Sequence, residues 1–146
     1  MAQPQQIAAP LMPDNVARIV AGYPPVAAAH LRNIRDLIYA MAAADSDIGP
    51  ITETLKWNEP AYLTEATGSG TTIRLAWKES NPDRIGIYVH CQTNIIETLR
   101  AMLPDDIEFE GNRALLLDIA KPLPAEPVRI AVRMAMTYHL AKRGKG

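Results

Sequence analysis

Two runs of alternating apolar and polar residues, at positions 71–78 and 85–91, constrain the fold of this chain most strongly. The apolar members are Ile73, Leu75 and Trp77 in the first run and Ile85, Ile87, Val89 and Cys91 in the second. A period of two is typical of a strand that has one face buried and the other exposed. The segment between the runs contains the turn-forming sequence Asn81-Pro82-Asp83, so we expect the two strands to pair antiparallel across a loop at 79–84.

An earlier segment, residues 54–57, alternates in the same way. Leu55 and Trp57 would then face the core, and Pro60 would end this strand or bend it, because proline cannot donate to a ladder of backbone hydrogen bonds. Together with the two later runs, this segment predicts a three-stranded antiparallel meander.

A second hairpin is expected nearer the C-terminus. Residues 107–110 and 113–120 flank Gly111-Asn112, a dipeptide that tolerates the positive φ angles of a tight turn. This hairpin brings the expected number of strands to five.

The remaining segments have helical periodicity. Helices are expected at 14–22, at 25–44, behind Asn94 as far as Pro104, and at 125–142. In the second of these, Arg35 falls outside the apolar stripe and is expected on the polar face. The order helix, helix, three strands, helix, two strands, helix contains no βαβ unit. It predicts an α+β fold in which helices pack on one face of a mainly antiparallel, five-stranded sheet.

Length and composition limit the organisation and the partners. The 146 residues suit a single domain at 14–146, preceded by a loose arm at 1–13 that is rich in proline and glutamine. With 15 basic and 16 acidic residues, the net charge of −1 supplies no general field for binding nucleic acid. No apolar run approaches the roughly 20 residues that span a bilayer, so we expect no membrane partner. The single cysteine and the absence of a secretory signal favour a cytoplasmic location.

The strand alternation also predicts a polar surface. If the apolar residues face the helices, Lys56, Arg74, Tyr88 and His90 share the opposite face of the sheet. Arginine offers a fork of donors, lysine a point charge, and histidine or tyrosine an adjustable hydrogen bond, a combination that suits a carboxylate or a phosphate. The alternative is that these residues form the solvated side of an antiparallel sheet.

Other chemistry has weaker support. Neighbouring strand residues point to opposite faces, so Cys91 is expected in the core and a nucleophilic pair with His90 is not expected. An acidic run could hold a hard cation or could be a solvated loop; it consists of Asp105, Asp106, Glu108 and Glu110. No phosphate-binding glycine loop, nucleophile elbow, zinc motif or dinucleotide fingerprint occurs. We therefore assign no catalytic residue, metal ligand or cofactor.

Residues 55–64, Leu-Lys-Trp-Asn-Glu-Pro-Ala-Tyr-Leu-Thr, resemble the Trp-x-x-Pro-x-Tyr signature of the YdhG-like family, catalogued as domain-of-unknown-function family 1801. Four further segments are similar to one branch of it: Thr72-Ile73-Arg74, His90-Cys91-Gln92-Thr93, Glu110-Gly111-Asn112-Arg113-Ala114 and Thr137-Tyr138-His139. The resemblance covers about residues 16–139 and implies an α+β fold with a helix-backed antiparallel sheet.

The resemblance implies less about function. Some relatives have been linked to iron delivery by analogy with frataxin, which would make the chain an iron chaperone that uses its acidic run. The branch is instead marked by basic and polar residues that favour an anion: Lys56, Arg74, His90, Asn112 and Arg113. Our leading hypothesis is a domain that binds a small anionic ligand or a partner. Its site would comprise Lys56, Arg74, Tyr88 and His90, with Asn112 and Arg113 at the rim. An iron chaperone and an enzyme with His90 as general base remain the alternatives.

Overall fold

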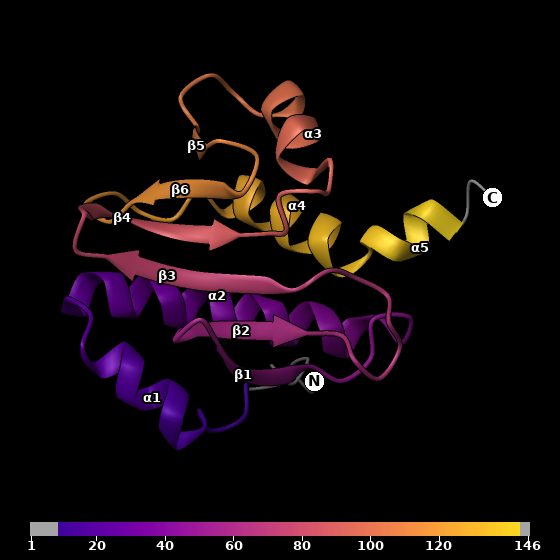
Figure 1. Cartoon of the computed structure of the whole chain (residues 1–146), viewed down its shortest axis with the longest axis horizontal. Helices are drawn as coiled ribbons and strands as arrows, with labels where there is room; N and C mark the ends of the chain where they lie inside the picture. The colour runs from indigo at the N-terminus through magenta and orange to yellow at the C-terminus, as the bar shows by residue number, and fades with distance from the viewer. Residues whose placement is uncertain (1–8, 144–146) are drawn as a thin grey trace, which may run out of the picture.

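A computed structural model describes residues 9–143, which form five helices and a six-stranded antiparallel sheet (Figure 1). The helices are α1 (Asp14–Ala21), α2 (Pro25–Ala44), α3 (Ile95–Met102), α4 (Ala125–Met136) and α5 (Tyr138–Arg143). The strands are β1 (Thr52–Lys56), β2 (Glu59–Leu63), β3 (Ile73–Lys78), β4 (Asn81–Tyr88), β5 (Glu108–Glu110) and β6 (Ala114–Asp118), in the order β1-β2-β3-β4-β6-β5. The expected α+β class is confirmed, whereas the expected count of five strands is wrong by one.

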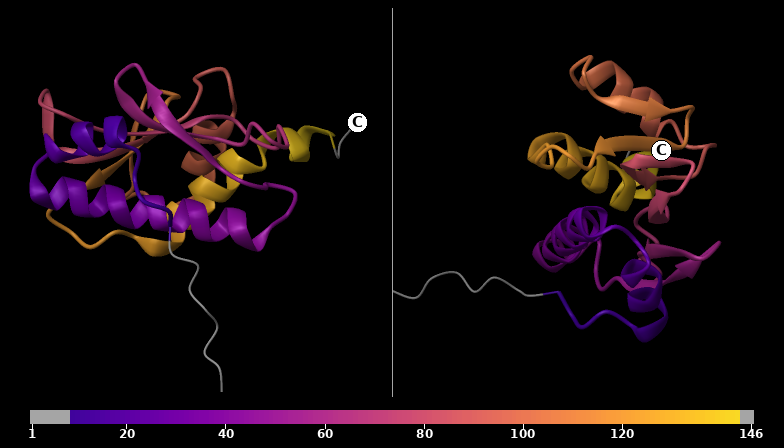
Figure 2. Two further views of the ribbon diagram at one scale, coloured as in Figure 1. Left: turned by 90° about the horizontal axis from the view of Figure 1, so that it is seen from below. Right: turned by 90° about the vertical axis from the view of Figure 1, so that its left-hand side faces the viewer.

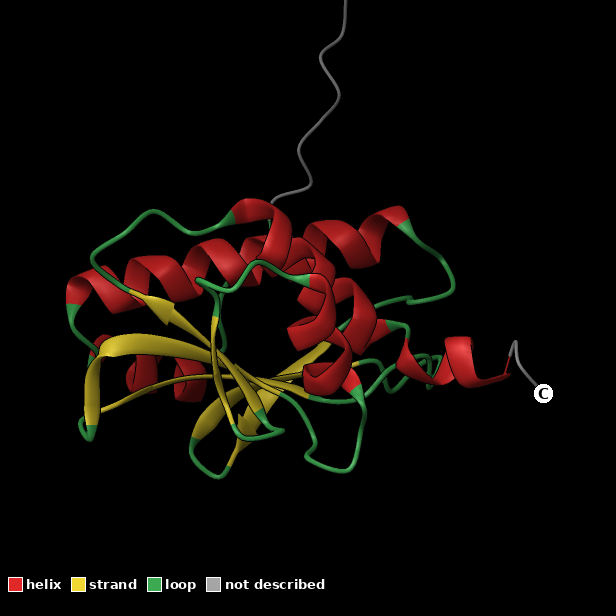
Figure 3. Cartoon of the chain, turned by 90° about the horizontal axis from the view of Figure 1, so that it is seen from above, coloured by secondary structure: helices red, strands yellow, loops and turns green. Residues whose placement is uncertain are grey.

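The molecule has two layers, and helices form only one of them. Helices α2 and α4 lie against one face of the sheet, while the opposite face carries no helix within residues 9–143 (Figures 2 and 3). The core between the layers includes Leu31, Ile34 and Ile38 from α2, Ile73 and Leu75 from β3, Ile85 and Ile87 from β4, Leu115 and Leu117 from β6, and Val128 and Val132 from α4. Ile73, Leu75, Ile85 and Ile87, which the strand alternation predicts to face the helices, thus lie in the core.

The additional strand arises because the segment around Trp57 is a turn. Trp57 and Asn58 have φ angles of 55° and 60°, the left-handed geometry of a two-residue hairpin that pairs Lys56 with Glu59. Trp57 is 88% exposed, so the expectation that it faces the core is wrong. Pro60 is accommodated inside β2 because the pairing of β2 with β3 begins only at the next residue.

The hairpin between β3 and β4 is tighter than expected. Lys78 pairs with Asn81, so β4 begins inside the segment that the sequence predicts to be a loop. A register irregularity between Trp77 and Lys78 accompanies the tight connection. The indole N–H of Trp77 donates to the carbonyl of Pro82 over 2.9 Å, which ties the two strands together at this end.

The expected helix at 125–142 is interrupted at Thr137, because its hydrogen bonds are exchanged with the loop before β3. In a continuous helix, the carbonyls of Ala135 and Met136 would accept from the amides of residues 139 and 140. Those two amides instead donate to the carbonyl of Ser69, at 2.9 and 3.2 Å. The carbonyl of Ala135 accepts from the Thr71 amide, and that of Met136 accepts from the Ser69 hydroxyl at 2.8 Å.

A buried ion pair joins the helical layer to the sheet. Arg35 of α2 donates to both carboxylate oxygens of Glu53 in β1, at 2.6 and 2.8 Å, and the Tyr39 hydroxyl donates to the same carboxylate at 3.1 Å. Arg35 is therefore buried rather than on the polar face of its helix, because a carboxylate from another element satisfies it. It also donates to the carbonyl of Pro10, so the end of the expected arm packs on the domain, whereas residues 1–8 lie outside the described residues.

No helix in the described part of the chain is both long and apolar enough to cross a membrane.

The exchange of hydrogen bonds at Thr137 requires close backbone contact at Gly70. A Cβ on Gly70 would lie 2.3 Å from the Ala135 carbonyl oxygen and 2.4 Å from the Met136 carbonyl carbon. We expect Gly70→Ala to lower the free energy of unfolding in urea by about 3 kcal/mol or more, since backbone cannot move aside cheaply. Gly111→Ala is the control: its φ of 51° is unfavourable, but no atom of the described residues lies within 4 Å of the added Cβ, so we expect a loss of about 1 kcal/mol. Equal losses would contradict this account.

The tyrosines around Glu53 predict a loss of stability at high pH. Burial and the Glu53 carboxylate raise the pKa of Tyr39 to about 12 and also raise the pKa of Tyr62. The unfolded chain would release these protons first, so their contribution is fully present below about pH 10 and is lost as pH rises toward 12. Among the described residues, the buried hydroxyl of Tyr62 has no hydrogen-bond partner. Tyr62→Phe should therefore leave stability at pH 7 unchanged and make its decline above pH 10 shallower; an unchanged decline would contradict this.

Candidate functional site

On the face of the sheet that no described helix covers lie the side chains of every second strand residue, and several of these are polar. The strand register aligns Ala61, Arg74, Tyr88, Ala114 and Glu110 in one row across β2, β3, β4, β6 and β5. Lys56 pairs with Glu59, two residues before Ala61, and so belongs to the same face. The structure therefore places Lys56, Arg74 and Tyr88 together on this face, as the alternation predicts.

Tyr88 forms part of a small apolar cluster on this face. Its side chain is buried with Ala76, Ala114 and Leu116. Its ring lies directly over Gly86, where an added Cβ would be only 2.4 Å from a ring carbon. Burial raises the pKa of the Tyr88 phenol, while the positive charge of Lys78 opposes that rise. The position of the ring indicates that Tyr88 supports the surface and does not present its hydroxyl to a ligand.

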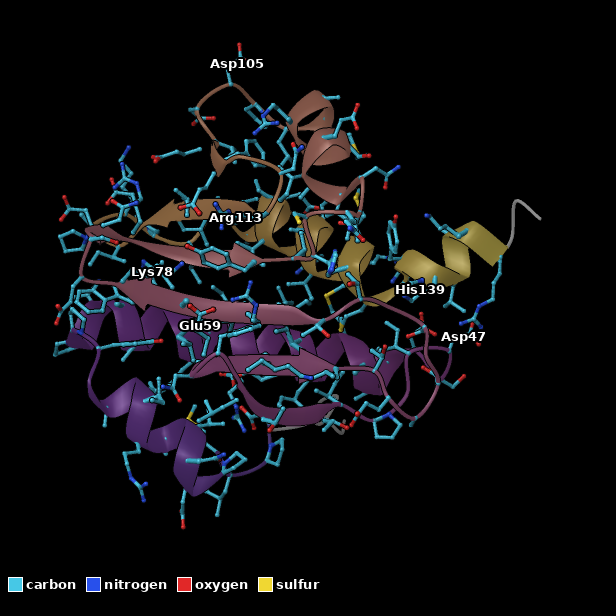
Figure 4. All side chains as sticks on the ribbon, viewed as in Figure 1. Asp47, Glu59, Lys78, Asp105, Arg113 and His139 are labelled. Atoms are coloured by element: carbon cyan, nitrogen blue, oxygen red, sulfur yellow. The ribbon has the colours of Figure 1, made fainter. Side chains whose placement is uncertain are left out.

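Two cations lie above the Tyr88 ring, and one carboxylate pairs with them. The guanidinium carbon of Arg74 is 5.4 Å from the ring centroid, and the Lys78 ammonium is 4.5 Å from it. Arg74 donates to one carboxylate oxygen of Glu59, and Lys78 lies 3.9 Å from the other. Figure 4 shows Glu59 and Lys78 on the same side of the sheet. Arg74 is thus already paired with an acid inside the chain.

An open hollow lies next to this group, at the end of β4. It has a volume of about 560 Å³ and is lined by Arg74, Val89, His90, Cys91, Gly111, Asn112 and Arg113. It brings together four residues that the sequence predicts for the site: Arg74, His90, Asn112 and Arg113. The other two are not among its lining, since Tyr88 is buried beneath the cations and Lys56 is exposed beside the β1–β2 turn.

His90 enters the hollow from a turn that follows β4. The carbonyl of His90 accepts from the hydroxyl of Thr93 at 2.7 Å and from its amide at 3.1 Å. The Gln92 amide lies 3.1 Å from Nδ1 of His90 and donates to it. Because Nδ1 is the acceptor, the neutral ring carries its proton on Nε2 and offers a donor there.

Cys91 also lines the hollow, and its side chain is exposed. The expectation of a core cysteine is wrong because the strand ends at Tyr88, so the alternation does not extend to Cys91. The last sheet-like bond is from the Val89 amide to the Arg113 carbonyl, at 2.8 Å. Since Nδ1 of His90 is occupied by an amide and Nε2 holds the proton, the neutral ring has no lone pair free to activate the thiol.

The β5–β6 turn holds Asn112 and Arg113 at the opposite rim. Gly111 has a φ of 51°, which confirms the need for a residue that tolerates positive φ in this hairpin. Arg100 of α3 donates to the carbonyl of Gly111 at 2.7 Å and anchors the turn from behind, a contact that no sequence pattern indicates. Arg113 lies 3.3 Å from Glu110, in a pair whose arginine is 61% exposed.

The acidic run does not converge on a point. Glu108 accepts from Arg84 at 2.9 Å, and Glu110 is paired with Arg113. Asp105 lies at the tip of the loop between α3 and β5 and points away from the sheet (Figure 4). Within residues 9–143, no group of three or more histidines, cysteines, aspartates or glutamates is placed to hold a metal ion.

Comparison with known proteins identifies no relative: no family model, no curated protein and no solved structure matches the chain. The resemblance of residues 55–64 to the YdhG-like signature therefore stays a prediction. The functional conclusion therefore rests on the geometry of the hollow.

The hydrogen bond from Gln92 predicts the tautomer of His90. In long-range ¹H–¹⁵N NMR spectra recorded at alkaline pH, we expect Nε2 of His90 to carry the proton and Nδ1 to show the shift of an unprotonated acceptor. His30 is the internal comparison, because its Nε2 lies 2.9 Å from the carbonyl of Lys121, which also requires a proton on Nε2. If neutral His90 instead carries its proton on Nδ1, Nε2 cannot donate a hydrogen bond into the hollow, and this prediction is wrong.

Proposed function

We propose that this chain binds a small organic anion in the hollow between Arg74, His90 and Arg113. The supporting observation is the convergence of three segments that are distant in sequence. Arg74 comes from β3, His90 follows β4, and Asn112 and Arg113 belong to the β5–β6 turn, yet all four line one hollow. A merely solvated sheet face gives no reason for such a convergence.

The donor set suits a carboxylate or a phosphate. Arg113 can supply two parallel N–H donors, and its pair with Glu110 is too exposed to hold it firmly. His90 contributes an N–H from Nε2, and Asn112 contributes an amide. None of the described residues lining the hollow is an aspartate or glutamate, although Glu59 pairs with Arg74 and Glu110 pairs with Arg113.

The size of the hollow leaves room for a carbon skeleton beside the acidic group of a ligand. Its volume of about 560 Å³ lies within the range of roughly 300–1,000 Å³ that is usual for small-molecule sites. Val89 and Cys91 add apolar surface beside the charged groups. A ligand with one acidic group and a short carbon skeleton would use both kinds of lining.

The same geometry disfavours the two alternatives, an iron chaperone and an enzyme with His90 as general base. The arginines that pair with Glu108 and Glu110 disfavour an iron site on the acidic run. A general base at His90 would need a free lone pair, whereas Nδ1 is occupied and Nε2 is protonated in the neutral ring. Binding without catalysis is therefore the proposed activity.

Two further assignments belong to the same proposal. A YdhG-like relationship implies a helix-backed antiparallel sheet, and the sheet order given above is compatible with it. A cytoplasmic location fits the single, exposed cysteine, which would be vulnerable to oxidation elsewhere. The net charge of −1 gives no support to nucleic acid as a partner.

Arginine variants test the proposal. We would titrate ¹⁵N-labelled protein with sodium succinate or sodium phosphate at constant ionic strength and follow the amide signals of Gln92 and Asn112. Arg113→Ala should weaken binding about tenfold, equivalent to about 1.4 kcal/mol, because a charge-assisted donor is lost.

Arg129→Ala is the matched control. Arg129 is also exposed and also pairs with a glutamate three residues earlier, but it lies on α4, away from the hollow. Its removal changes the net charge equally and should alter the dissociation constant by less than about twofold, a screened surface effect. Equal weakening by both variants, or no saturable shift at Gln92 and Asn112 with either anion, would refute the proposal.

A further inference from the structure

Glu59 accepts a hydrogen bond from Arg74, an arginine that lines the proposed site. Arg74 lines the hollow and at the same time donates to the carboxylate of Glu59. The Glu59 side chain is only 15% exposed, so its carboxylate is largely withdrawn from water. Glu59 itself is not among the residues lining the hollow. The chain thus places a carboxylate of its own on one of the donors that a ligand would use.

We propose that Glu59 is an internal competitor, which a carboxylate ligand displaces from Arg74 when it binds. This inference rests on the proposed anion site and adds the class of ligand and the way the site is regulated. Arg74 in its present position already matches a carboxylate, so a ligand with a carboxylate group can replace Glu59 without a change in the donor chemistry.

Lys78 lowers the free-energy cost of displacing Glu59 from Arg74. Its ammonium lies 3.9 Å from the second oxygen of Glu59 and 4.5 Å from the Tyr88 ring centroid. Lys78 is not among the residues that line the hollow, so a ligand there does not compete for it. When the ligand takes Arg74, Glu59 keeps Lys78 as its partner and no carboxylate is left unpaired.

The exchange also connects the hollow to the β1–β2 turn. Glu59 directly follows Trp57 and Asn58, both held at positive φ, and it pairs with Lys56 across the hairpin. A shift of Glu59 toward Lys78 therefore changes the surroundings of a turn whose residues do not line the hollow. The amides of Asn58 and Glu59 should respond to a ligand with the same apparent dissociation constant as the amide of Asn112.

Variants of Glu59 test the displacement with sodium succinate as the probe. Glu59→Gln removes the competing charge and should tighten succinate binding about tenfold. Glu59→Asp keeps the charge but is one methylene shorter, so it should reach Arg74 less well and tighten binding by about threefold at unchanged net charge.

Glu108→Gln is the matched control, because Glu108 also pairs with an arginine, Arg84, that does not line the hollow. Its removal should change the dissociation constant by less than about twofold. Thermal unfolding of each variant checks that the domain still folds, and Glu59→Asp carries the test if Glu59→Gln disturbs β2.

The outcomes separate this inference from the proposed function. Tightening by both Glu59 variants but not by Glu108→Gln, with coupled shifts at Asn58 and Glu59, supports displacement. Binding by the wild type with no change in either Glu59 variant overturns displacement and leaves the anion site standing. Equal tightening by Glu59→Gln and Glu108→Gln also overturns it, since it shows a general field effect. Absence of binding in the wild type and in every variant refutes the anion site itself.

Discussion

The structure depends on one constraint: within residues 9–143, helices cover one face of a twisted antiparallel sheet and leave the other uncovered, so every second strand residue lies on the uncovered face. The strand register turns this alternation into a row of neighbours that runs from Ala61 through Arg74 and Tyr88 to Ala114 and Glu110. The ion pairs on the open face and the hollow at its end follow from this row. A shift of one residue in β3 would move Arg74 into the core and remove the site.

Two arginine–glutamate pairs show how burial changes the role of one interaction. Arg35 and Glu53 lie between the helices and the sheet, where loss of either partner would strand a buried charge. Arg74 and Glu59 lie on the open face, with Lys78 beside them as a second cation. The first pair fixes α2 to β1, whereas the second is the pair for which we propose an exchange of partners. The pair that stabilises the fold and the pair that we propose responds to a ligand thus lie on opposite faces of the same sheet.

The sequence correctly predicts those parts of the fold that are determined by neighbouring residues. The helical stripes, the alternation within β3 and β4 and the hairpin at Gly111 are each decided by neighbouring residues, and the structure contains them. The hairpin loop has three residues, Gly111 to Arg113, where two were expected, because Glu110 pairs with Ala114. The α+β class and the place of Arg74 on the open face followed from them, whereas His90 lies beyond the end of β4, and Asn112 and Arg113 were expected from the YdhG-like resemblance.

The differences arise where contacts distant in sequence prevail. The C-terminal helix is interrupted because Ser69 and Thr71 take part in its hydrogen bonds, and Arg35 is buried because Glu53 meets it from another element. Trp57 follows the alternation but occupies a turn, since the strand reverses one residue earlier than the pattern indicates. The pairing of Glu59 with Arg74 likewise needs the register between β2 and β3, which the sequence does not specify.

The most direct test of the anion site is a crystal structure of the protein soaked in sodium selenate, with data collected at the selenium absorption edge. We expect an anomalous peak within hydrogen-bond distance of the Arg113 guanidinium and Nε2 of His90. Peaks found only elsewhere on the surface, with this hollow empty at high selenate concentration, would contradict it.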